Sequence, residues 1–308
     1  MIICLGPTPT LQRTMTFKSL EIDGVNRAAS VRQYAAGKSI NAARVLRTLN
    51  REVMALGFSG GQFGELLEQD MTASGMPHNF VNVGSPTRLC ITLIDQKAGT
   101  ATELIEESAA ISPSDDESLL TKLAQHLNRA KLLVLSGTLP PQANDDFYAR
   151  CIQVAGKVPV ILDAVNQPLL AALPFKPLVV KPNRSEVGRT LGIDVRLDSS
   201  LRGGMKELIS RGAQWVVVTQ GKDHTLLTDG QSFWEISTPT VKVVSAIGSG
   251  DSFAAGLAAG LADGNDLPHA CALAAACGAA NAMSPHSGHL AREDVNQFLQ
   301  AIEIKKIK

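Results

Sequence analysis

The stretch SAIGSGDSFAAGLAAGL, residues 245–261, predicts a glycine-rich turn that leads into an Ala/Gly-rich helix. A short extended segment, 241–245, runs into this turn. Glycines at a helix start let free backbone N–H groups approach an anion, and the helix dipole favours negative charge there. Asp251 stands at the mouth of this anion hole, where it can take a proton from an alcohol. Taken alone, the stretch is equally typical of a glycine turn with Asp251 as N-cap.

Upstream of this stretch, short runs rich in Val, Ile and Leu alternate with helical patterns. Near-continuous apolar strands separated by helices predict a parallel sheet covered on both faces. Ligand is then expected beyond the carboxyl ends of the strands. The predicted strands are 2–6, 53–58, 132–137, 158–163, 178–183 and 215–221, and the helical stretches lie at about 39–49, 63–74, 115–128, 144–155 and 199–211.

Two segments break the alternation and look like extended strands with alternating polar and apolar residues. In the second, Leu89, Ile91 and Leu93 alternate with Arg88 and Thr92. We predict that segments at about 8–35 and 86–107 pair as a small β-sheet, a lid inserted in a single domain spanning 1–308. The alternative is an irregular edge of the main domain. An exposed small sheet often associates with another chain, so the sequence also suggests a homodimer through the lid.

The composition limits which classes of binding partner are expected. The 308 residues carry 29 Lys plus Arg against 29 Asp plus Glu, so the formal net charge is zero. This balance argues against a general nucleic-acid or acidic-membrane binder, while a small anionic substrate needs only a few local cations. The five cysteines are scattered and never form CxxC, which fits a reducing cytoplasm. The start lacks a signal peptide, and the apolar stretch 270–283 is too short to span a membrane and predicts a buried helix.

Three other patterns resemble known binding motifs but do not support them. Residues 37–39, GKS, resemble a Walker A ending, but the first glycine of that loop would fall at Arg32. The GSGDSF segment lacks the third glycine of the dinucleotide fingerprint. His286 and His289 have a ligand-like spacing without a nearby acid cluster, so the sequence does not favour a metal site there.

The order of motifs resembles the ribokinase/PfkB carbohydrate kinase superfamily over nearly the whole chain. The most similar branch acts on hexose phosphates: 1-phosphofructokinase, tagatose-6-phosphate kinase and the minor 6-phosphofructokinase. KPNRSE (181–186) and GSGD (248–251) are specific together. The other matching segments are AAGKSINAARVL (35–46), PTRLCITLID (86–95), TELIE (102–106), LSGTLPP (135–141), ILDA (161–164), VVVTQG (216–221) and CGAANAMSP (277–285). The resemblance implies a ribokinase-like α/β fold, with a mainly parallel central sheet flanked by helices and a small β-sheet lid.

For the nucleotide half, the resemblance implies ATP as co-substrate with Mg²⁺. Asp251 matches the catalytic base, and Gly248, Ser249 and Gly250 match the anion hole for the transferring γ-phosphoryl group. Glu186 matches a glutamate that acts on magnesium through water. Asn281 matches a residue near the adenine, although it could equally pair within its helix. The remaining nucleotide-binding matches are Lys181, Asn183, Thr219 and Gly221.

For the acceptor half, Gly37, Lys38 and Asn41 match the family's sugar-binding turn. Arg27 and Arg88 stand where the hexose-phosphate branch uses basic residues on the acceptor's existing phosphate, which a planar guanidinium suits. Three positions depart from the family pattern. Gln12 replaces an Asp that holds sugar hydroxyls, Ser39 replaces a glycine and Ala246 replaces a threonine.

The resemblance therefore implies a cytoplasmic kinase that phosphorylates an alcohol group of a ketohexose phosphate. Fructose 1-phosphate is favoured because residues 24–46 most resemble that enzyme's stretch. Tagatose 6-phosphate and fructose 6-phosphate stay close behind. A kinase for an unphosphorylated sugar or nucleoside and a non-catalytic sugar-phosphate sensor are the open alternatives.

Overall fold

Alternate residues of the central strands pack into two different hydrophobic cores. In the computed structural model, which describes residues 1–307, Ile2 and Cys4 of β1 (Ile2–Leu5) lie in one core, whereas Ile3 and Leu5 lie in the other. Successive side chains of a strand point to opposite faces, so a strand buried on both faces must be apolar at every position. This explains the near-continuous Val/Ile/Leu runs.

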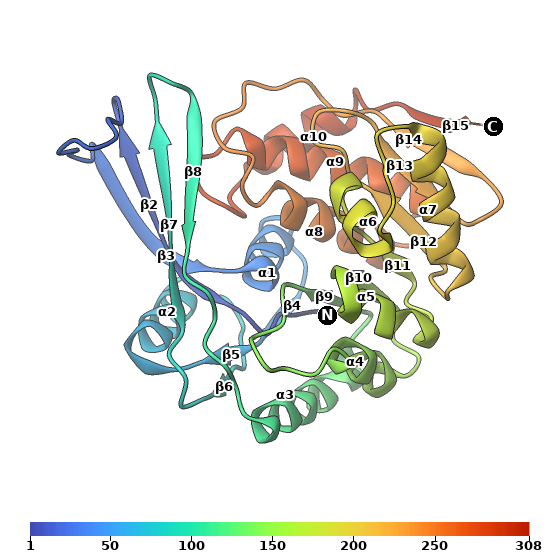
Figure 1. The fold of residues 1–308 in the computed structure, drawn as a ribbon, viewed down its shortest axis with the longest axis horizontal. Coiled ribbons are helices and arrows are strands. Elements are labelled where there is room, and N and C mark those ends of the chain that lie inside the picture. The colour runs from blue at the N-terminus through green and yellow to red at the C-terminus, as the bar shows by residue number, and fades with distance from the viewer. Residues whose placement is uncertain (308) are drawn as a thin grey trace.

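Within residues 1–307 the main sheet has nine strands in the order β15-β14-β13-β12-β11-β10-β9-β1-β4 (Figure 1). The strands from β4 to β12 run parallel, and β13 to β15 extend one edge in antiparallel fashion. Each apolar run predicted as a strand contributes to this sheet, so the mainly parallel α/β prediction is confirmed. The remaining strands of this sheet are β4 (Val53–Leu56), β9 (Leu132–Ser136), β10 (Val160–Asp163), β11 (Val179–Val180), β12 (Trp215–Val218), β13 (Thr225–Thr228), β14 (Phe233–Ile236) and β15 (Ile304–Ile307).

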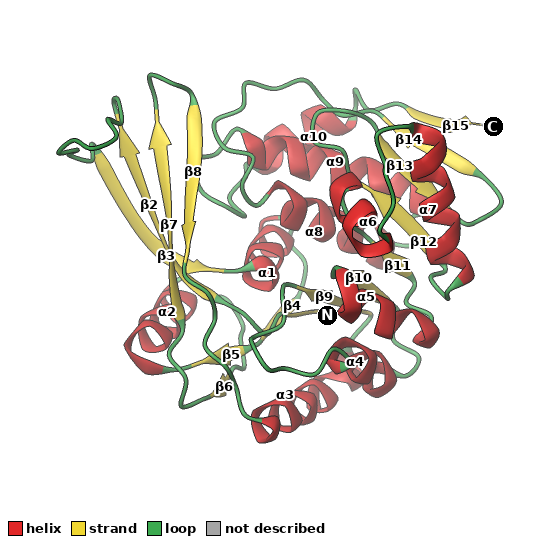
Figure 2. Cartoon of the chain, in the orientation of Figure 1, coloured by secondary structure: helices red, strands yellow, loops and turns green. Residues whose placement is uncertain are grey.

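Helices cover both faces of the main sheet (Figure 2). One core is shared with α1 (Lys38–Thr48), α2 (Gly61–Ala73), α8 (Ser249–Ala262), α9 (Leu267–Ala282) and α10 (Arg292–Leu299). The other core is shared with α3 (Pro113–His126), α4 (Phe147–Ala155), α5 (Asn166–Ala172), α6 (Arg184–Leu191) and α7 (Asp198–Ser210).

Small residues let α8 and α9 pack closely. A Cβ added to Gly256 would lie 2.7 Å from the Cα of Ala274, and one added to Gly260 would lie 2.8 Å from the Cα of Ala270. The apolar stretch 270–283 is therefore a buried helix, as predicted, and it fixes the helix that carries Asp251. None of the helices in residues 1–307 is long and apolar enough to cross a membrane.

A separate small sheet has the order β3-β2-β7-β8 and projects from the main body, with α2 packed against β2 and β3 at its base (Figures 1 and 2). Its strands are β2 (Thr10–Phe17), β3 (Ser30–Ala36), β7 (Arg88–Asp95) and β8 (Thr100–Ile105), and a further short pair is β5 (Phe58–Ser59) with β6 (Val81–Asn82). The predicted alternation is present, but the buried face holds polar side chains beside the apolar Cys90 and Ile94. Gln12, Thr14 and Thr92 are buried, whereas Ile91 and Leu93 lie on the opposite, half-exposed face.

Candidate active site

Side chains from several strand ends and two helix starts meet at the carboxyl edge of the parallel strands. Gly6, after β1, leaves no room for a side chain because its Cβ would lie 2.6 Å from Ser39 Oγ and 2.7 Å from the carbonyl oxygen of Ser136. Lys38 opens α1 and reaches Asp163 at the end of β10. The close approach at Gly6 shows what Ser39, a departure from the family pattern, does here: it packs against the strand end.

The loop before α8 presents backbone donors. Gly248 has φ 81°, a left-handed conformation that favours glycine, and an added Cβ would lie 2.6 Å from Ser287 Cβ. Ser249 N donates to the carbonyl of Ala246, while no acceptor within residues 1–307 takes the N–H of Gly250 or Asp251. These two donors lie in the positively polarised first turn of a helix, where an anion is stabilised.

Asp251 is buried in that first turn and touches the predicted acceptor turn. Its Oδ2 accepts a 2.8 Å hydrogen bond from Asn41 Nδ2. Burial raises the pKa of Asp251 to about 6, against the opposing effects of Lys38 and of the Asn41 hydrogen bond. A carboxylate with such a pKa is ionised at neutral pH and is a better proton acceptor than an ordinary aspartate.

Asp163 is the site residue that sequence reasoning missed. Its Oδ2 lies 3.4 Å from the ammonium nitrogens of both Lys38 and Lys181, and the carboxylate is buried. Burial opposes its ionisation, but Lys181 and Lys38 hold its pKa below the usual value. Asp163 also raises the pKa of Lys38. It thereby joins the predicted nucleotide lysine to the predicted acceptor lysine. Its place at the end of a buried strand was the available signal.

The KPNRSE segment builds the start of α6 as well as part of the site. The Asn183 side chain accepts from Glu186 N at 2.9 Å, and Glu186 Oε2 accepts from Asn183 N at 2.7 Å. This capping box uses the Asn183 oxygen and one Glu186 oxygen. The Asn183 amide nitrogen and Glu186 Oε1 have no hydrogen-bond partner within residues 1–307. The Asn183 amide nitrogen is therefore available for the predicted nucleotide contact, and Glu186 Oε1 is available for the predicted magnesium contact.

Two other predicted nucleotide residues lie beside this segment. Thr219 pairs with Asn183 in an isolated bridge, and its carbonyl accepts from Arg184 N at 3.1 Å. Gly221 follows in an exposed turn with φ 64°. The structure thus brings the KPN and VTQG segments together.

Asn281, which is predicted to lie near the adenine, makes hydrogen bonds inside the protein. It is fully buried in α9, its Nδ2 donates to the Ile247 carbonyl at 2.9 Å, and its Oδ1 accepts from Gly288 N at 2.8 Å. Both ends of the amide are therefore used inside the protein. Here Asn281 holds the loop before α8 in place, and its partners lie outside α9, unlike the pairing within its own helix that the sequence left open.

The predicted acceptor turn joins β3 to α1. Gly37 has φ 112°, and an added Cβ would lie 2.9 Å from Pro9 Cα, so the close approach requires glycine. Lys38 and Asn41 then project from the first turns of α1 toward Asp163 and Asp251. Gln12, on β2, donates from Nε2 to Thr92 Oγ1 at 2.8 Å, which leaves its Oε1 as the group without a partner in residues 1–307.

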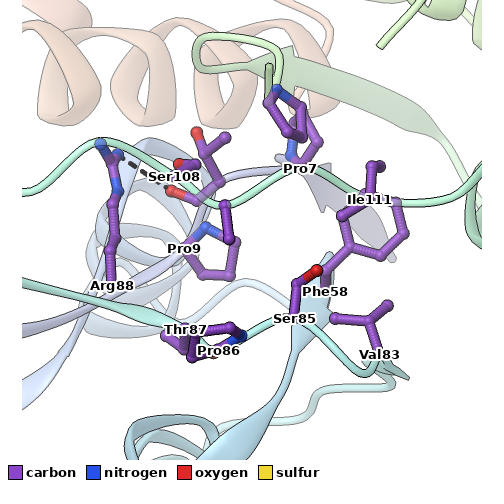
Figure 3. Close-up of a pocket in the computed structure, with 13 residues that line it drawn as sticks. Pro7, Pro9, Phe58, Val83, Ser85, Pro86, Thr87, Arg88, Ser108 and Ile111 are labelled. Carbon is purple, nitrogen blue, oxygen red and sulfur yellow. Dashed lines mark hydrogen bonds between the residues drawn. The ribbon is translucent and has the colours of Figure 1, made fainter. Parts of the chain in front are cut away.

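The two predicted phosphate-binding arginines lie at opposite ends of the small sheet. Arg88 pairs with Thr10 at its base, and its guanidinium donates to the carbonyl oxygens of Thr8 at 3.2 Å and Glu106 at 3.3 Å. It lines a pocket with Pro9 and Ser108 (Figure 3). Arg27 is exposed in the β2–β3 loop, beyond the Thr16–Ser30 pair, and the structure does not bring it to Arg88.

Comparison with known proteins gives one family and a consistent fold. The pfkB family carbohydrate kinase model matches residues 3–293. A provisionally assigned phosphofructokinase from Staphylococcus aureus is 29% identical, with 100% of this chain and 99% of that chain covered and a TM-score of 0.82. Phosphofructokinase-2 from Escherichia coli in complex with fructose-6-phosphate is 24% identical, with 97% and 98% covered and a TM-score of 0.86.

A provisionally assigned 1-phosphofructokinase from Thermotoga maritima has a TM-score of 0.90 at 21% identity, with 100% of each chain covered. The family match runs from β1, before the acceptor turn, to the start of α10, beyond Asn281, and so includes both halves of the site. The chain therefore belongs to the pfkB family of carbohydrate kinases and is a sugar kinase.

Proposed function

We propose that this kinase transfers the γ-phosphoryl group of ATP to an alcohol of a ketohexose phosphate, with fructose 1-phosphate as the favoured acceptor and fructose 1,6-bisphosphate as the product. The observation that carries phosphotransfer is the 2.8 Å contact between Asn41 and Asp251. It joins the predicted acceptor turn to Asp251, a carboxylate that stands beside the backbone N–H groups of Gly250 and Asp251, which have no acceptor within residues 1–307. Arg88, at the acceptor end, supports a substrate that already carries a phosphate.

Each residue has a simple task in this proposal. Asp251 accepts the proton of the attacking hydroxyl, and the N–H groups of Gly250 and Asp251 stabilise charge on the transferring group. Lys181, whose Nζ lies 3.9 Å from a Cβ placed on Gly250, adds a cation beside that loop. Positioning and charge neutralisation of this kind supply most of the catalysis of phosphoryl transfer.

The residues suit a Mg²⁺ ion that arrives with the nucleotide. The described residues contain no group of three or more His, Cys, Asp or Glu side chains that could hold a metal by themselves. Mg²⁺ commonly takes one or two carboxylates together with waters and substrate phosphates. Glu186 offers one free carboxylate oxygen beside the Lys181–Asn183 segment and would hold the ion, directly or through water. The ion would neutralise phosphate charge.

One assay separates the open substrates. ADP release is measured with ATP over fructose 1-phosphate, tagatose 6-phosphate, fructose 6-phosphate, free fructose and a nucleoside. The highest kcat/KM on a ketohexose phosphate is the expected outcome. A preference for a free sugar or nucleoside would contradict the proposal, and no turnover on any of them would favour the sugar-phosphate sensor.

Gln12→Asp is expected to raise kcat/KM about 2- to 10-fold on the true ketohexose phosphate. The Gln12 amide nitrogen is engaged with Thr92, so only the neutral Oε1 can accept from a sugar hydroxyl. An aspartate offers two charged acceptors, and hydrogen bonds to charged groups are roughly twice as strong as neutral ones. Thr92 can turn its hydroxyl to donate to the new carboxylate.

The measurement is kcat/KM of wild type and Gln12→Asp on the three hexose phosphates, with Thr92→Ser as the matched control that keeps the hydroxyl. Lower activity on all three, from already poor wild-type values, would mean that the reaction is right and the acceptor class is wrong.

We also propose that the small sheet acts as a lid and pairs with a second copy of the chain. Its outer face carries half-exposed apolar side chains, with Val31 56% and Leu104 50% exposed. Leu104→Lys is expected to convert a dimer to a monomer because a buried, unpaired charge opposes association. Sedimentation velocity measures this, with Val154→Lys on α4 as an exposed apolar control. An unchanged dimer in Leu104→Lys would rule out this face.

A further inference from the structure

The turn SPHSGHL, residues 284–290, has no assigned function, yet it lies between the two halves of the site. A Cβ added to Gly288 would lie 2.8 Å from Asn41 Cα, and one added to Gly248 would lie 2.6 Å from Ser287 Cβ. Gly288 N also donates to Asn281 Oδ1. The turn is therefore packed against α1 on one side and the loop before α8 on the other.

Ser287 connects this turn to Asn41. Its Oγ lies 3.4 Å from Asn41 Oδ1, which also accepts from Arg44 Nη1 at 3.3 Å. Because two donors hold the carbonyl end of the Asn41 amide, its nitrogen is directed at Asp251. Ser287, Asn41 and Asp251 are all buried, so a misoriented amide would leave polar groups unpaired.

Tyr34 connects the same turn to the small sheet. Its hydroxyl oxygen accepts from Ser287 N at 3.2 Å and lies 3.4 Å from Ser287 Oγ and 3.3 Å from Thr14 Oγ1. Tyr34 is on β3, which leads through Gly37 directly into α1. One strand of the small sheet thus reaches Asn41 by the chain and by the Ser287 contacts.

The two histidines hold Tyr34 as neutral rings. His286 and His289 pack edge-on against Tyr34, with ring centroids 5.6 and 5.2 Å away. His289 Nε2 lies 3.1 Å from Arg32 Nη2, and an arginine can only donate, so Nε2 accepts and Nδ1 donates to the Ser287 carbonyl at 3.0 Å. Burial, with Arg44 nearby, lowers the pKa of His289 to about 3. The spacing of His286 and His289 places both rings against Tyr34.

We propose that Tyr34 and Ser287 are positioning residues that orient Asn41 and so hold Asp251 ready to accept a proton. The charged groups around Asp251 are Lys38 from α1, Lys181 after β11 and Asp163 from β10. The Asn41 hydrogen bond acts in the same direction as the lysines, because it favours the ionised carboxylate. We call the contacts from Tyr34 through Ser287 and Asn41 to Asp251 the relay. Through it, the Asn41–Asp251 hydrogen bond depends on the position of the small sheet. The inference rests on the proposed function only in giving Asp251 the task of proton acceptor.

Ser287→Ala and Tyr34→Phe each remove one hydroxyl of the relay and test it. The Asp251 carboxyl is titrated by ¹³C NMR in the substrate-free, aspartate-labelled enzyme, with its signal assigned by its absence from Asp251→Asn. Loss of a hydrogen bond to the ionised form is expected to move the titration midpoint up by about 0.5 pH unit. The acid limb of kcat/KM moves with it, and the plateau falls about 3- to 10-fold.

The matched control is Thr228→Val, which removes a buried hydroxyl on β13, far from α1 in the strand order of the main sheet. The double variant is expected to fall no further than the worse single variant, because both changes break one relay. Unmoved midpoints in both single variants, or an equal shift in Thr228→Val, would overturn the relay. A shifted midpoint in an enzyme that phosphorylates none of the sugars would support the relay and contradict the proposed function.

Discussion

Asp251→Asn is expected to lower kcat by roughly 10²–10⁴-fold, the usual span for a lost general base, with little change in ATP affinity. The substitution keeps the shape of the side chain and leaves an oxygen that can accept from Asn41 Nδ2. What it removes is the carboxylate that we propose takes the proton. Coupled ADP release at saturating ATP and sugar phosphate measures the loss, and near-normal turnover would contradict the assignment of Asp251.

The same carboxylate sets an expected pH dependence. Because burial raises the pKa of Asp251 to about 6, kcat/KM is expected to fall roughly tenfold per pH unit below that value as the carboxylate becomes protonated.

The raised pKa of Asp251 also means that the native state binds the proton more tightly than the unfolded state. Its ionisation therefore costs stability as the pH rises from about 4 through 6. Asp251→Asn removes that cost, and at pH 8 it is expected to stabilise the fold by roughly 1–3 kcal/mol. Urea unfolding of wild type and variant at pH 5 and pH 8 measures the gain, which should be larger at pH 8.

The main sheet could be predicted from the sequence because a strand buried on both faces is apolar at nearly every position. Ile2–Leu5 and Leu132–Ser136 show this directly. The small sheet was harder. Its alternation is visible at 88–93, but its polar side faces inward because Gln12, Thr14 and Thr92 satisfy one another and their neighbours in buried hydrogen bonds. A hydrophobicity pattern cannot show that a polar face is the buried one.

The site divides in the same way. Asp251 and the glycines before it follow from local chain chemistry and from the family resemblance together. Asp163 does not, because its importance comes from two lysines that are 125 and 18 positions away in the sequence, which only the strand order brings together. The partners of Asn281 could not be predicted either, because the sequence does not show what a polar residue on a buried helix contacts. In the structure the Ile247 carbonyl and Gly288 N use both ends of its amide.

Arg88→Ala is expected to raise KM for the phosphorylated acceptor about 10- to 150-fold while KM for ATP stays nearly constant. A hydrogen bond to a charged group is worth roughly 1.5–3 kcal/mol, which gives this range if binding equilibrates. The structure holds the Arg88 guanidinium at the proposed acceptor end through the carbonyls of Thr8 and Glu106, which take one N–H each from Nη2 and Nη1. A guanidinium held in this way keeps donors free for a phosphate.

The control for this variant is Arg13→Ala. Arg13 lies on β2 of the same small sheet, but its guanidinium donates to Gln33 on the half-exposed face. Arg13→Ala removes the same charge from a side chain that does not face the proposed acceptor site, so the KM values of this variant should match those of wild type. Because Arg88→Ala also loses two backbone contacts, KM for free fructose is measured in parallel, and a rise confined to the phosphorylated sugar separates phosphate recognition from a loosened sheet. If KM for the sugar phosphate and for free fructose rises equally in Arg88→Ala, the residue supports the fold of the acceptor end. If neither rises, the phosphosugar proposal loses its main support.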